Sequence, residues 1–528
     1  MKIIKLSGKV LLGMAVSFTT TASNAFSQQK NAKPNIVIIY ADDLGYGDVQ
    51  CYNPERGKIP TPNIDKLAAQ GMSFTDAHSS SAVCSPSRYS LLTGRYHWRS
   101  RLQKGIVGLF EKPLITPDRL TIAGLVKQEG YNTACIGKWH LGWDWSIDKE
   151  KRPLWDVNKA KEGQDDEVYF ATEEQKKAWQ NVYSKPIKGG PTTLGFDYYF
   201  GTDVPNWPPY CFIENDQTVG VPSEFLPKKL LGNNMASLPG PALHEWKLED
   251  VLPELCSKAI EYISRSAKED KPFLLYLPLT SPHTPLAVTN EWKGKSQLKN
   301  QYADFVMETD AQIGRVLEAI EKSGESDNTL IIFTSDNGCT PHHCAVELES
   351  KGHFPSGPLR GYKSDVWEGG HRIPFIVRWP DVTNPATVCE QFVQQSDLMA
   401  TIADILEIKL PETAGEDSQS ILSLLKGKNK PVRETGVSCS IQGVPAIRFG
   451  SWKLILGEGS GGWSKVVSDQ PIQLYNLADD LGEQKNLAAN EPKRVAKMKA
   501  MLEKIISDGR STPGAVQKND VQVSRFPK

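Results

Sequence analysis

The sequence predicts an α/β fold in which helices cover both faces of a parallel sheet. Residues 35–40 (NIVIIY) form a continuous β-branched run, which is typical of a buried strand in a parallel sheet. Helical patterns and similar apolar runs then alternate along the chain, as in sheets whose strands are joined by helical crossovers. Polar residues also follow directly after several of these runs, at the strand ends where open parallel sheets bind their ligands.

The remaining elements of this sheet follow in a regular order. Helices are indicated by apolar residues at helical spacing and by a glycine after the last turn. In the helix that ends at Gly324, for example, Ile313, Val316, Leu317 and Ile320 lie on one face. The expected elements are, in chain order, helix 121–129, strand 132–136, helix 248–268, strand 272–278, the helix before Gly324, strand 329–334 and strand 373–377.

Two parts of the chain do not fit this alternation. Residues 142–250 are rich in Trp, Pro, Gly and charge, and we interpret them as long insertions over one end of the sheet. After a polar turn near residue 430, antiparallel strands are expected at 446–456 and 472–477, and a closing helix at 492–507. The predicted domains are a main domain at 33–425 and a small α+β subdomain at 430–528.

The charge balance argues against a dedicated nucleic-acid binder. Lys and Arg number 61 and Asp and Glu number 62, so the net charge is −1 and no basic surplus can neutralise a phosphate backbone. Apolar residues make up 39% and charged residues 23%, which is ordinary for globular proteins and excludes disordered or collagen-like chains. Composition alone names no reaction.

The N-terminus has the pattern of a secretory signal peptide at residues 1–25. Three lysines in the first nine residues precede an apolar run at 10–18, and Ser23 and Ala25 are small residues at plausible cleavage positions. This apolar run is too short to span a bilayer, so we favour a cleaved signal over a retained membrane anchor. The mature protein is therefore expected to be exported to the periplasm or secreted, without a stable membrane anchor.

The nine cysteines are an odd number, which leaves one to explain in an exported protein. Cys339 and Cys344 are close enough in sequence to pair, although spacing alone does not show that they do. No Cys-x-x-Cys motif occurs, so a zinc ribbon or a thioredoxin-like site has no support.

Two pairs of oxygen-bearing side chains follow two of the expected strands. Asp42 and Asp43 come directly after the first strand, and Asp336 and Asn337 follow strand 329–334. Carboxylate and amide oxygens are the ligands preferred by hard cations such as Ca²⁺ or Mg²⁺. Each pair alone could instead cap a helix or form a turn, but two pairs at two strand ends favour a metal site.

Three basic side chains follow other strands. Lys138 and His140 alternate after strand 132–136, so on an extended segment both point the same way. His283 lies between two prolines, in a rigid turn after strand 272–278. A solvated lysine, a packed histidine and a loop histidine are the alternative interpretations of these residues.

Residues 84–95 (CSPSRYSLLTGR) decide between the catalytic and the purely structural interpretations of these polar residues. They resemble the signature of the type I sulfatase family, Cys-x-Pro-x-Arg with a following Leu-Thr-Gly-Arg. The resemblance implies that Cys84 is oxidised to formylglycine by a formylglycine-generating or anaerobic sulfatase-maturating enzyme. It also accounts for the odd cysteine. The alternative is a buried free cysteine before a helix.

The resemblance extends over nearly the whole mature chain. Further matching blocks occur in the family's order: ADDLG at 41–45, GKWHLG at 137–142, SDNG at 335–338, LRGYK at 359–363 and EGG at 368–370. They imply an alkaline-phosphatase-like fold, a three-layer α/β/α sandwich with a large mixed, mostly parallel sheet. A small C-terminal antiparallel sheet and helix complete the implied fold.

The resemblance also implies the chemistry. Hydrated formylglycine offers two hydroxyls, one to attack sulfur and one to expel sulfate by rebuilding the aldehyde. One cation, Ca²⁺ with Mg²⁺ as the alternative, would act on a sulfate oxygen as a Lewis acid. Its implied ligands are Asp42, Asp43, residue 84 (Cys84), Asp336 and Asn337.

Five further residues receive roles from the resemblance. Arg88 would steady the diol by charge-assisted hydrogen bonds. Lys138 and Lys363 would neutralise sulfate oxygens. His283 is the candidate general acid for the leaving oxygen, and His140 the candidate base for sulfate release.

The expected substrate is a sulfated carbohydrate of host glycans or glycosaminoglycans. The block at 95–99 and the loop around Asn206 look similar to bacterial sulfatases that act on 6-O-sulfated galactose or N-acetylgalactosamine, and we expect an exo-acting enzyme. A phosphatase or phosphodiesterase of the same superfamily and a non-catalytic glycan-binding homologue are the alternatives. The candidate substrate contacts are Arg99, Gln103, Asn206, Tyr210, His342 and His343.

Overall fold

The computed structural model describes residues 33–155, 171–231, 237–465 and 470–523. The chain divides into two units, Met1–Lys33 and Pro34–Lys528, and the fold described here belongs to the second. The predicted signal peptide at 1–25 lies outside the described residues. No helix in the described ranges is both long and apolar enough to cross a membrane.

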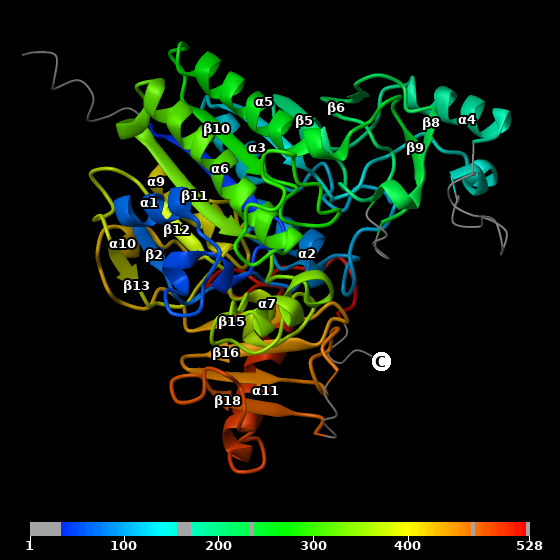
Figure 1. Cartoon of the computed structure of the whole chain (residues 1–528). Coiled ribbons are helices and arrows are strands. Elements are labelled where there is room, and N and C mark those ends of the chain that lie inside the picture. Colours follow the sequence, from blue (N-terminus) through cyan, green and yellow to red (C-terminus); the bar gives the residue numbers. More distant parts are fainter. Residues whose placement is uncertain (1–32, 156–170, 232–236, 466–469, 524–528) are drawn as a thin grey trace, which may run out of the picture. The chain divides into compact units, whose positions relative to one another are not determined.

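A mixed, mostly parallel sheet of ten strands forms the centre of the second unit, as the sequence predicts (Figure 1). The central strands β11, β1, β10 and β4 are all parallel, while β12 runs antiparallel to both of its neighbours, β11 and β2. In spatial order the strands are β13 (Thr387–Cys389), β2 (Met72–Phe74), β12 (Phe375–Arg378), β11 (Thr329–Ser335), β1 (Asn35–Ala41), β10 (Phe273–Pro278), β4 (Asn132–Lys138), β5 (Tyr198–Thr202), β6 (Ile213–Glu214) and β7 (Gln217–Thr218).

Helices cover both faces of this sheet. Both faces are apolar, because successive side chains of a strand point to opposite faces. In β1, Ile36 and Ile38 belong to one apolar core, whereas Val37 and Ile39 belong to the other. The first core is closed by α2 (Cys84–Thr93), α3 (Ile122–Gln128) and α9 (Asp397–Ile405). The second is closed by α1 (Pro62–Gln70), α5 (Val251–Ser266) and α6 (Gln301–Lys322).

The region at 142–250 is more regular than the sequence suggests. It contains β5, which pairs in parallel with β4 and extends the main sheet. Periodicity did not reveal this strand, because its five residues (YYFGT) form only a short run. The other named strands and helices of residues 77–425 are β3 (Ala77–His78), α4 (Glu173–Tyr183), β8 (Glu224–Leu226), β9 (Gly240–Ala242), α7 (Val346–Ser350), α8 (Glu368–His371), β14 (Val393–Gln394) and α10 (Leu422–Leu425).

A four-stranded antiparallel sheet follows near the C-terminus, in the order β15 (Thr435–Cys439), β16 (Pro445–Phe449), β17 (Trp452–Ile455) and β18 (Gln473–Asn476). The single strand expected at 446–456 is two strands, because the chain reverses at Gly450, whose positive φ of 57° suits a tight turn. Helix α11 (Pro492–Ser507) has the predicted limits and packs Met498 and Leu502 into the core of this sheet. The domain boundary at 425–430 stays a prediction.

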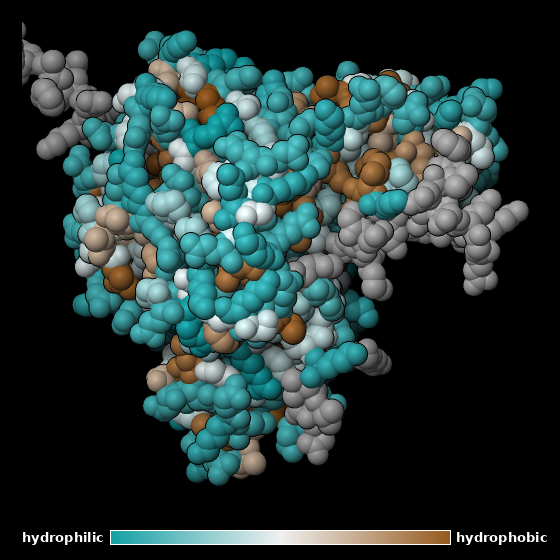
Figure 2. Space-filling model, in the orientation of Figure 1, coloured by the Kyte–Doolittle hydropathy of each residue, from teal (hydrophilic) through white to brown (hydrophobic). Residues whose placement is uncertain are grey.

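Apolar side chains are concentrated inside the molecule, and the surface in Figure 2 is mainly hydrophilic, with apolar residues in small separate groups. The polar residues that are buried are therefore conspicuous. Several lie at the C-terminal ends of the central parallel strands, where they form the site described next.

Candidate active site

The ends of four parallel strands bring the predicted polar residues to one edge of the sheet. Ala41, the last residue of β1, lies opposite Ser335, the last residue of β11. Tyr40 lies opposite Pro278, the last residue of β10, and β10 pairs with β4. The side chains that follow these strands come together because the strands run in the same direction.

Three ion pairs join the carboxylates of this edge to three cations. Every partner is buried, so each charge depends on its partner for compensation. The pairs are Lys138 Nζ with Asp42 Oδ2 (2.7 Å), Lys363 Nζ with Asp43 Oδ2 (2.7 Å) and Arg88 Nη2 with Asp336 Oδ2 (2.9 Å). Arg88 also contacts Asp42, with 3.2 Å between Nη2 and Oδ1.

Burial and neighbouring charges shift the pKa values of these groups in different directions. Burial would raise the pKa of Asp42, but Lys138 and then His283 and Arg88 hold that pKa well below its usual value. Burial and then the Asp42 charge raise the pKa of Asp336. Burial alone would lower the pKa of Lys363, but the Asp43 carboxylate more than offsets it.

The donor set fits one hard cation. Ligand atoms of Asp42, Cys84 and Asp336 lie within 4.8 Å of one another, and Asp42 and Asp43 form a second such group with His283. The Oδ1 atom of Asn337 is buried and accepts no hydrogen bond from any described residue, although its Nδ2 donates to Asp43 Oδ1 at 2.8 Å. A buried amide oxygen without a hydrogen-bond donor suits a cation ligand, because the cation would satisfy its lone pairs.

The sequence around Cys84 explains why this residue lies at the site. Cys84 is the first residue of α2, and Pro86 occupies the first turn, where a missing backbone N–H costs no helical hydrogen bond. The helix ends at Gly94, which adopts a left-handed conformation with φ of 62°. Cys84 is buried, and burial raises the pKa of its thiol.

The two histidines present different ring nitrogens. His283 Nδ1 lies 2.5 Å from the Thr284 carbonyl, to which it donates, so Nε2 is left 3.7 Å from Asp43 Oδ2. Burial and then Lys363 lower the pKa of His283 to about 4. His140 Nε2 donates to the Val107 carbonyl at 3.2 Å, and its buried Nδ1 has no hydrogen-bond donor among the described residues.

Residues 34–408 match the family described as Sulfatase, which is well over half of the chain. The chain belongs to the sulfatase family. N-acetylgalactosamine-6-O-sulfatase of Bacteroides thetaiotaomicron is 33% identical to this sulfatase over 492 residues, which cover 90% of this chain and 94% of that protein. Human steryl-sulfatase is 28% identical over 457 residues, covering 76% of this chain and 70% of its own length.

A solved structure agrees with these sequence matches. It comes from work on the metabolism of multiple glycosaminoglycans by Bacteroides thetaiotaomicron and superposes with a TM-score of 0.74 at 30% identity. The match covers 90% of this sulfatase and 99% of that chain. This sulfatase is therefore a sulfuric ester hydrolase with the alkaline-phosphatase-like fold that its motifs imply.

Two of the six candidate substrate residues make hydrogen bonds to other parts of the protein. The guanidinium of Arg99 is fully buried and bonds Asp417 through Nε and Nη2, both at 2.8 Å. Arg99 also bonds Ile505 and Asn519 and is thereby held to the C-terminal region, and its role as a substrate contact stays a prediction. Gln103 Nε2 donates to the Gln522 carbonyl at 2.9 Å, which also ties it to the C-terminal segment.

The other candidate substrate residues stay predictions. Asn206 and Tyr210 are buried, and the Tyr210 hydroxyl donates to the Leu238 carbonyl at 2.6 Å. Their loop nevertheless reaches the site, since the Trp207 ring lies 5.6 Å from the His140 ring. His342 is exposed beside Trp463, and the side chain of His343 lies outside the described residues.

Two residues of this sulfatase to which the sequence assigned no individual role lie beside the predicted ones. Asp203 accepts from the His140 backbone N–H, through its carbonyl at 3.1 Å and its carboxylate at 3.2 Å. It follows a strand directly, which is the signal that could have found it. Trp463 approaches Lys363 from the C-terminal region, and no local pattern indicates this contact.

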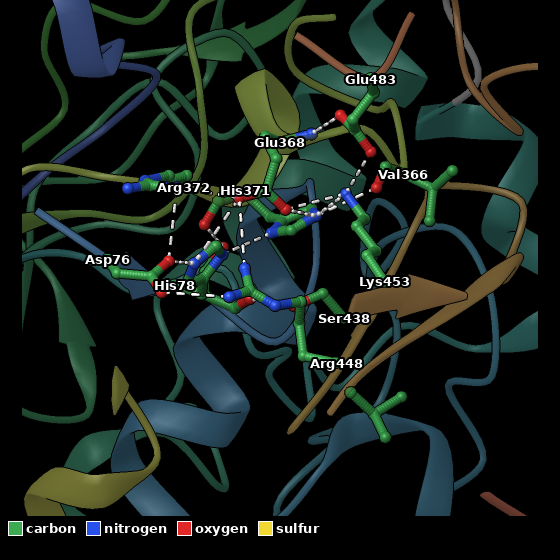
Figure 3. Close-up of polar contacts among 12 residues, drawn as sticks. Asp76, His78, Val366, Glu368, His371, Arg372, Ser438, Arg448, Lys453 and Glu483 are labelled. Carbon is green, nitrogen blue, oxygen red and sulfur yellow. Dashed lines mark hydrogen bonds and ion pairs between the residues drawn. The ribbon is translucent and has the colours of Figure 1, made fainter. Parts of the chain in front are cut away.

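A second buried cluster resembles a metal site but is already neutralised (Figure 3). Ligand atoms of His78, Glu368 and His371 lie within 4.8 Å of one another. However, Lys453 Nζ lies 2.9 Å from Glu368 Oε1, and Arg448 Nη1 lies 3.7 Å from Glu368 Oε2. These two cations compensate the carboxylate, and we interpret the cluster as a structural charge network.

Proposed function

We propose that this sulfatase removes the 6-O-sulfate of galactose or N-acetylgalactosamine, as an exo-enzyme, from host glycans or glycosaminoglycans. The observation that carries the substrate proposal is the 33% identity with an N-acetylgalactosamine-6-O-sulfatase over 90% of this chain. The 30% identical structure, which comes from work on glycosaminoglycan metabolism, supports the same class of substrate.

Two groups supplied after synthesis belong to this proposal. Oxidation of Cys84 to formylglycine by a maturation enzyme supplies a hydrated aldehyde, in which one hydroxyl attacks sulfur and the other allows sulfate to leave. A divalent cation, Ca²⁺ or alternatively Mg²⁺, supplies Lewis-acid polarisation of a sulfate oxygen. Asp42, Asp43, Asp336 and Asn337 would hold this cation, because their oxygens form the donor set described above.

The cations of the site have two tasks in this mechanism. Lys138 and Lys363 are paired with Asp42 and Asp43, which would orient their ammonium groups before substrate binds. We assign them the neutralisation of the sulfate oxygens. Arg88 extends from α2, one turn after Cys84, and can steady the hydroxyls of the modified residue by charge-assisted hydrogen bonds.

The histidines would move the protons. His283 keeps Nδ1 on the Thr284 carbonyl, so Nε2 is the atom that can carry a proton to the departing sugar oxygen. Burial lowers its pKa to about 4 when cation and substrate are both absent, and the negative charge of a bound sulfate ester would raise it. His140 keeps Nε2 on the Val107 carbonyl, so Nδ1 can accept the proton released when the aldehyde is rebuilt.

The cellular setting follows from the N-terminal pattern and belongs to the same proposal. The lysine-rich start and short apolar run indicate export to the periplasm or secretion. Oxidation of Cys84 by a formylglycine-generating or anaerobic sulfatase-maturating enzyme would accompany export. Sulfated glycans from outside the cell would then be accessible to the mature sulfatase.

A panel of defined sulfated sugars tests the substrate proposal. The full chain, produced with a maturation enzyme, should release sulfate from 6-O-sulfated galactose and N-acetylgalactosamine, and much more slowly from 2-O- and 3-O-sulfated sugars. The matched control is Cys84→Ala, which cannot be matured and should be inactive on every sugar. Activity confined to 2-O- or 3-O-sulfates would overturn the substrate proposal.

The same preparations test the nucleophile and the phosphatase alternative. Intact mass of the tryptic peptide around residue 84 should show formylglycine in the wild type. An unmodified thiol in fully active protein would refute the proposed nucleophile. Phosphate esters of the same sugars should be hydrolysed poorly, and preferential release of phosphate would favour the phosphatase alternative.

A further inference from the structure

Trp463 is an exposed aromatic side chain beside the proposed sulfate site. It lies in the segment between β17 and β18 of the C-terminal sheet. All thirteen tryptophans of the chain lie in the described ranges, and Trp463, at 38%, is the exposed one among them. The other tryptophans are buried or half-buried, so this exposed ring needs its own explanation.

The ring of Trp463 adjoins a residue of the proposed mechanism. Lys363 Nζ lies 5.9 Å from the ring centroid and only 2.7 Å from Asp43 Oδ2. The exposed side chain of His342 also adjoins the tryptophan, with its ring 5.1 Å from that of Trp463 and tilted by 45°. The exposed tryptophan therefore lies beside the buried ammonium group that we assign to sulfate.

The backbone around Trp463 is fixed to the loop that carries Lys363. The Trp463 N–H donates to Ser364 Oγ at 2.8 Å, and the Ser464 N–H donates to Asp365 Oδ1 at 3.1 Å. A side chain at Gly462 would place its Cβ 2.4 Å from the Ser364 carbonyl oxygen, so the two segments need a glycine there to approach so closely. Trp463 is thus held relative to Lys363 and is not a loosely placed surface residue.

This arrangement has the chemistry of a sugar platform. The flat, apolar face of a tryptophan packs well against the C–H face of a pyranose ring, while a neighbouring ammonium group binds an anionic substituent of the same sugar. In a galacto-configured sugar the axial O4 leaves the hydrogens of C3, C4 and C5 on one face, which suits such packing. A gluco-configured sugar presents a less continuous C–H face.

We propose that Trp463 is a specificity-determining residue, which packs against the pyranose ring whose sulfate lies at Lys363. This inference rests on the proposed function and adds a contact from the C-terminal region to it. The binding site would then be completed by two segments that lie about a hundred residues apart in sequence, as the Ser364–Trp463 hydrogen bond already joins them.

Steady-state kinetics of Trp463→Ala and Trp463→Phe test the proposal. With 6-O-sulfated N-acetylgalactosamine, Trp463→Ala should raise KM about tenfold while kcat stays within about twofold, because packing against the sugar acts in binding. Trp463→Phe should keep most of the affinity. The inhibition constant of inorganic sulfate, which has no sugar ring, should be unchanged in both variants.

A control variant separates this role from the stability of the C-terminal sheet. Trp452 lies on the same sheet with Arg494 stacked 3.9 Å from its ring, so Trp452→Phe should leave KM unaltered. An unchanged KM in Trp463→Ala, or equal weakening of sugar and inorganic sulfate binding, would overturn the proposal. If the wild type prefers another sulfated sugar, the substrate proposal fails and the KM comparison is made with that sugar.

Discussion

Replacing Lys453 by methionine should destabilise this sulfatase strongly, because this lysine neutralises the buried charge network of Figure 3. Its Nζ lies 2.9 Å from Glu368 Oε1, 2.9 Å from Glu483 Oε1 and 3.2 Å from His371 Nε2. All four side chains are buried. Methionine fills a similar volume but leaves two carboxylates without their shared cation.

The size of the effect follows from this geometry. Removing one partner of a buried ion pair costs about 3–5 kcal/mol, because the remaining charge stays out of water. For a unit as long as Pro34–Lys528, the unfolding entropy is roughly 1 kcal/mol per kelvin, so each kcal/mol lowers Tm by about 1 °C. We therefore expect Lys453→Met to lower Tm by about 3–5 °C at pH 7.5.

Protonation of Glu483 should reduce this loss at acidic pH. Burial and the nearby Glu368 already raise the pKa of Glu483 above its usual value, although Lys453 opposes this shift. Without the lysine that pKa rises further, so the folded variant binds a proton more readily than the unfolded chain. The Tm difference between variant and wild type should therefore shrink as the pH falls from 7.5 to 6.

Thermal unfolding followed by calorimetry provides the assay. The control is Lys66→Met, since Lys66 is 59% exposed and pairs with the exposed Glu321 at 3.3 Å, and its Tm should stay within about 1 °C. The double variant Lys453→Met/Glu483→Gln should regain part of the lost stability, because one carboxylate is neutralised. A Tm for Lys453→Met within 1 °C of the wild type, or a loss that grows toward pH 6, would refute this reasoning.

Two other predictions concern acid stability and the cation. Burial lowers the pKa of His97 to about 3, so the unfolded state binds more protons than the folded state below pH 6.5. The free energy of unfolding should therefore fall by about 1.4 kcal/mol per pH unit between roughly pH 6 and pH 4. The variant His97→Leu should flatten this part of a profile of Tm against pH, and an equally steep profile would contradict the assignment. Chelation should abolish sulfate release and lower Tm, and Ca²⁺ at 100 times its dissociation constant should restore about 2.7 kcal/mol. Stronger recovery with Mg²⁺ would contradict the choice of Ca²⁺.

The central strands and the polar residues after them were predictable because they depend on short stretches of sequence. Asn35–Ala41 is buried on both faces, and such strands appear as continuous apolar runs. Parallel strands end at one edge of a sheet, so Asp42 and Asp336 could be expected to meet although they are far apart in the chain. The motif at Cys84 then indicated the chemistry, which composition alone could not indicate.

The parts that sequence reasoning missed depend on contacts between distant segments. The apolar run in β12 is the same whether the strand is parallel or antiparallel, so only its pairing with β11 reveals the direction. Arg99 was a candidate substrate contact, yet it is buried and paired with the distant Asp417. Trp463 meets Lys363 through the folding of the C-terminal sheet, and no spacing or periodicity encodes that contact.

The loop that carries Lys363 explains why the C-terminal sheet belongs to the site. The Ser364 N–H donates to the Ala82 carbonyl at 2.7 Å, two residues before Cys84, and the Ser364 carbonyl accepts from the Ile441 N–H at 2.9 Å. Ser364 thereby links the segment that leads to the proposed nucleophile with the turn that follows β15. A shift of the C-terminal sheet would move Lys363 relative to residue 84, so both regions together set the geometry on which sulfate binding depends.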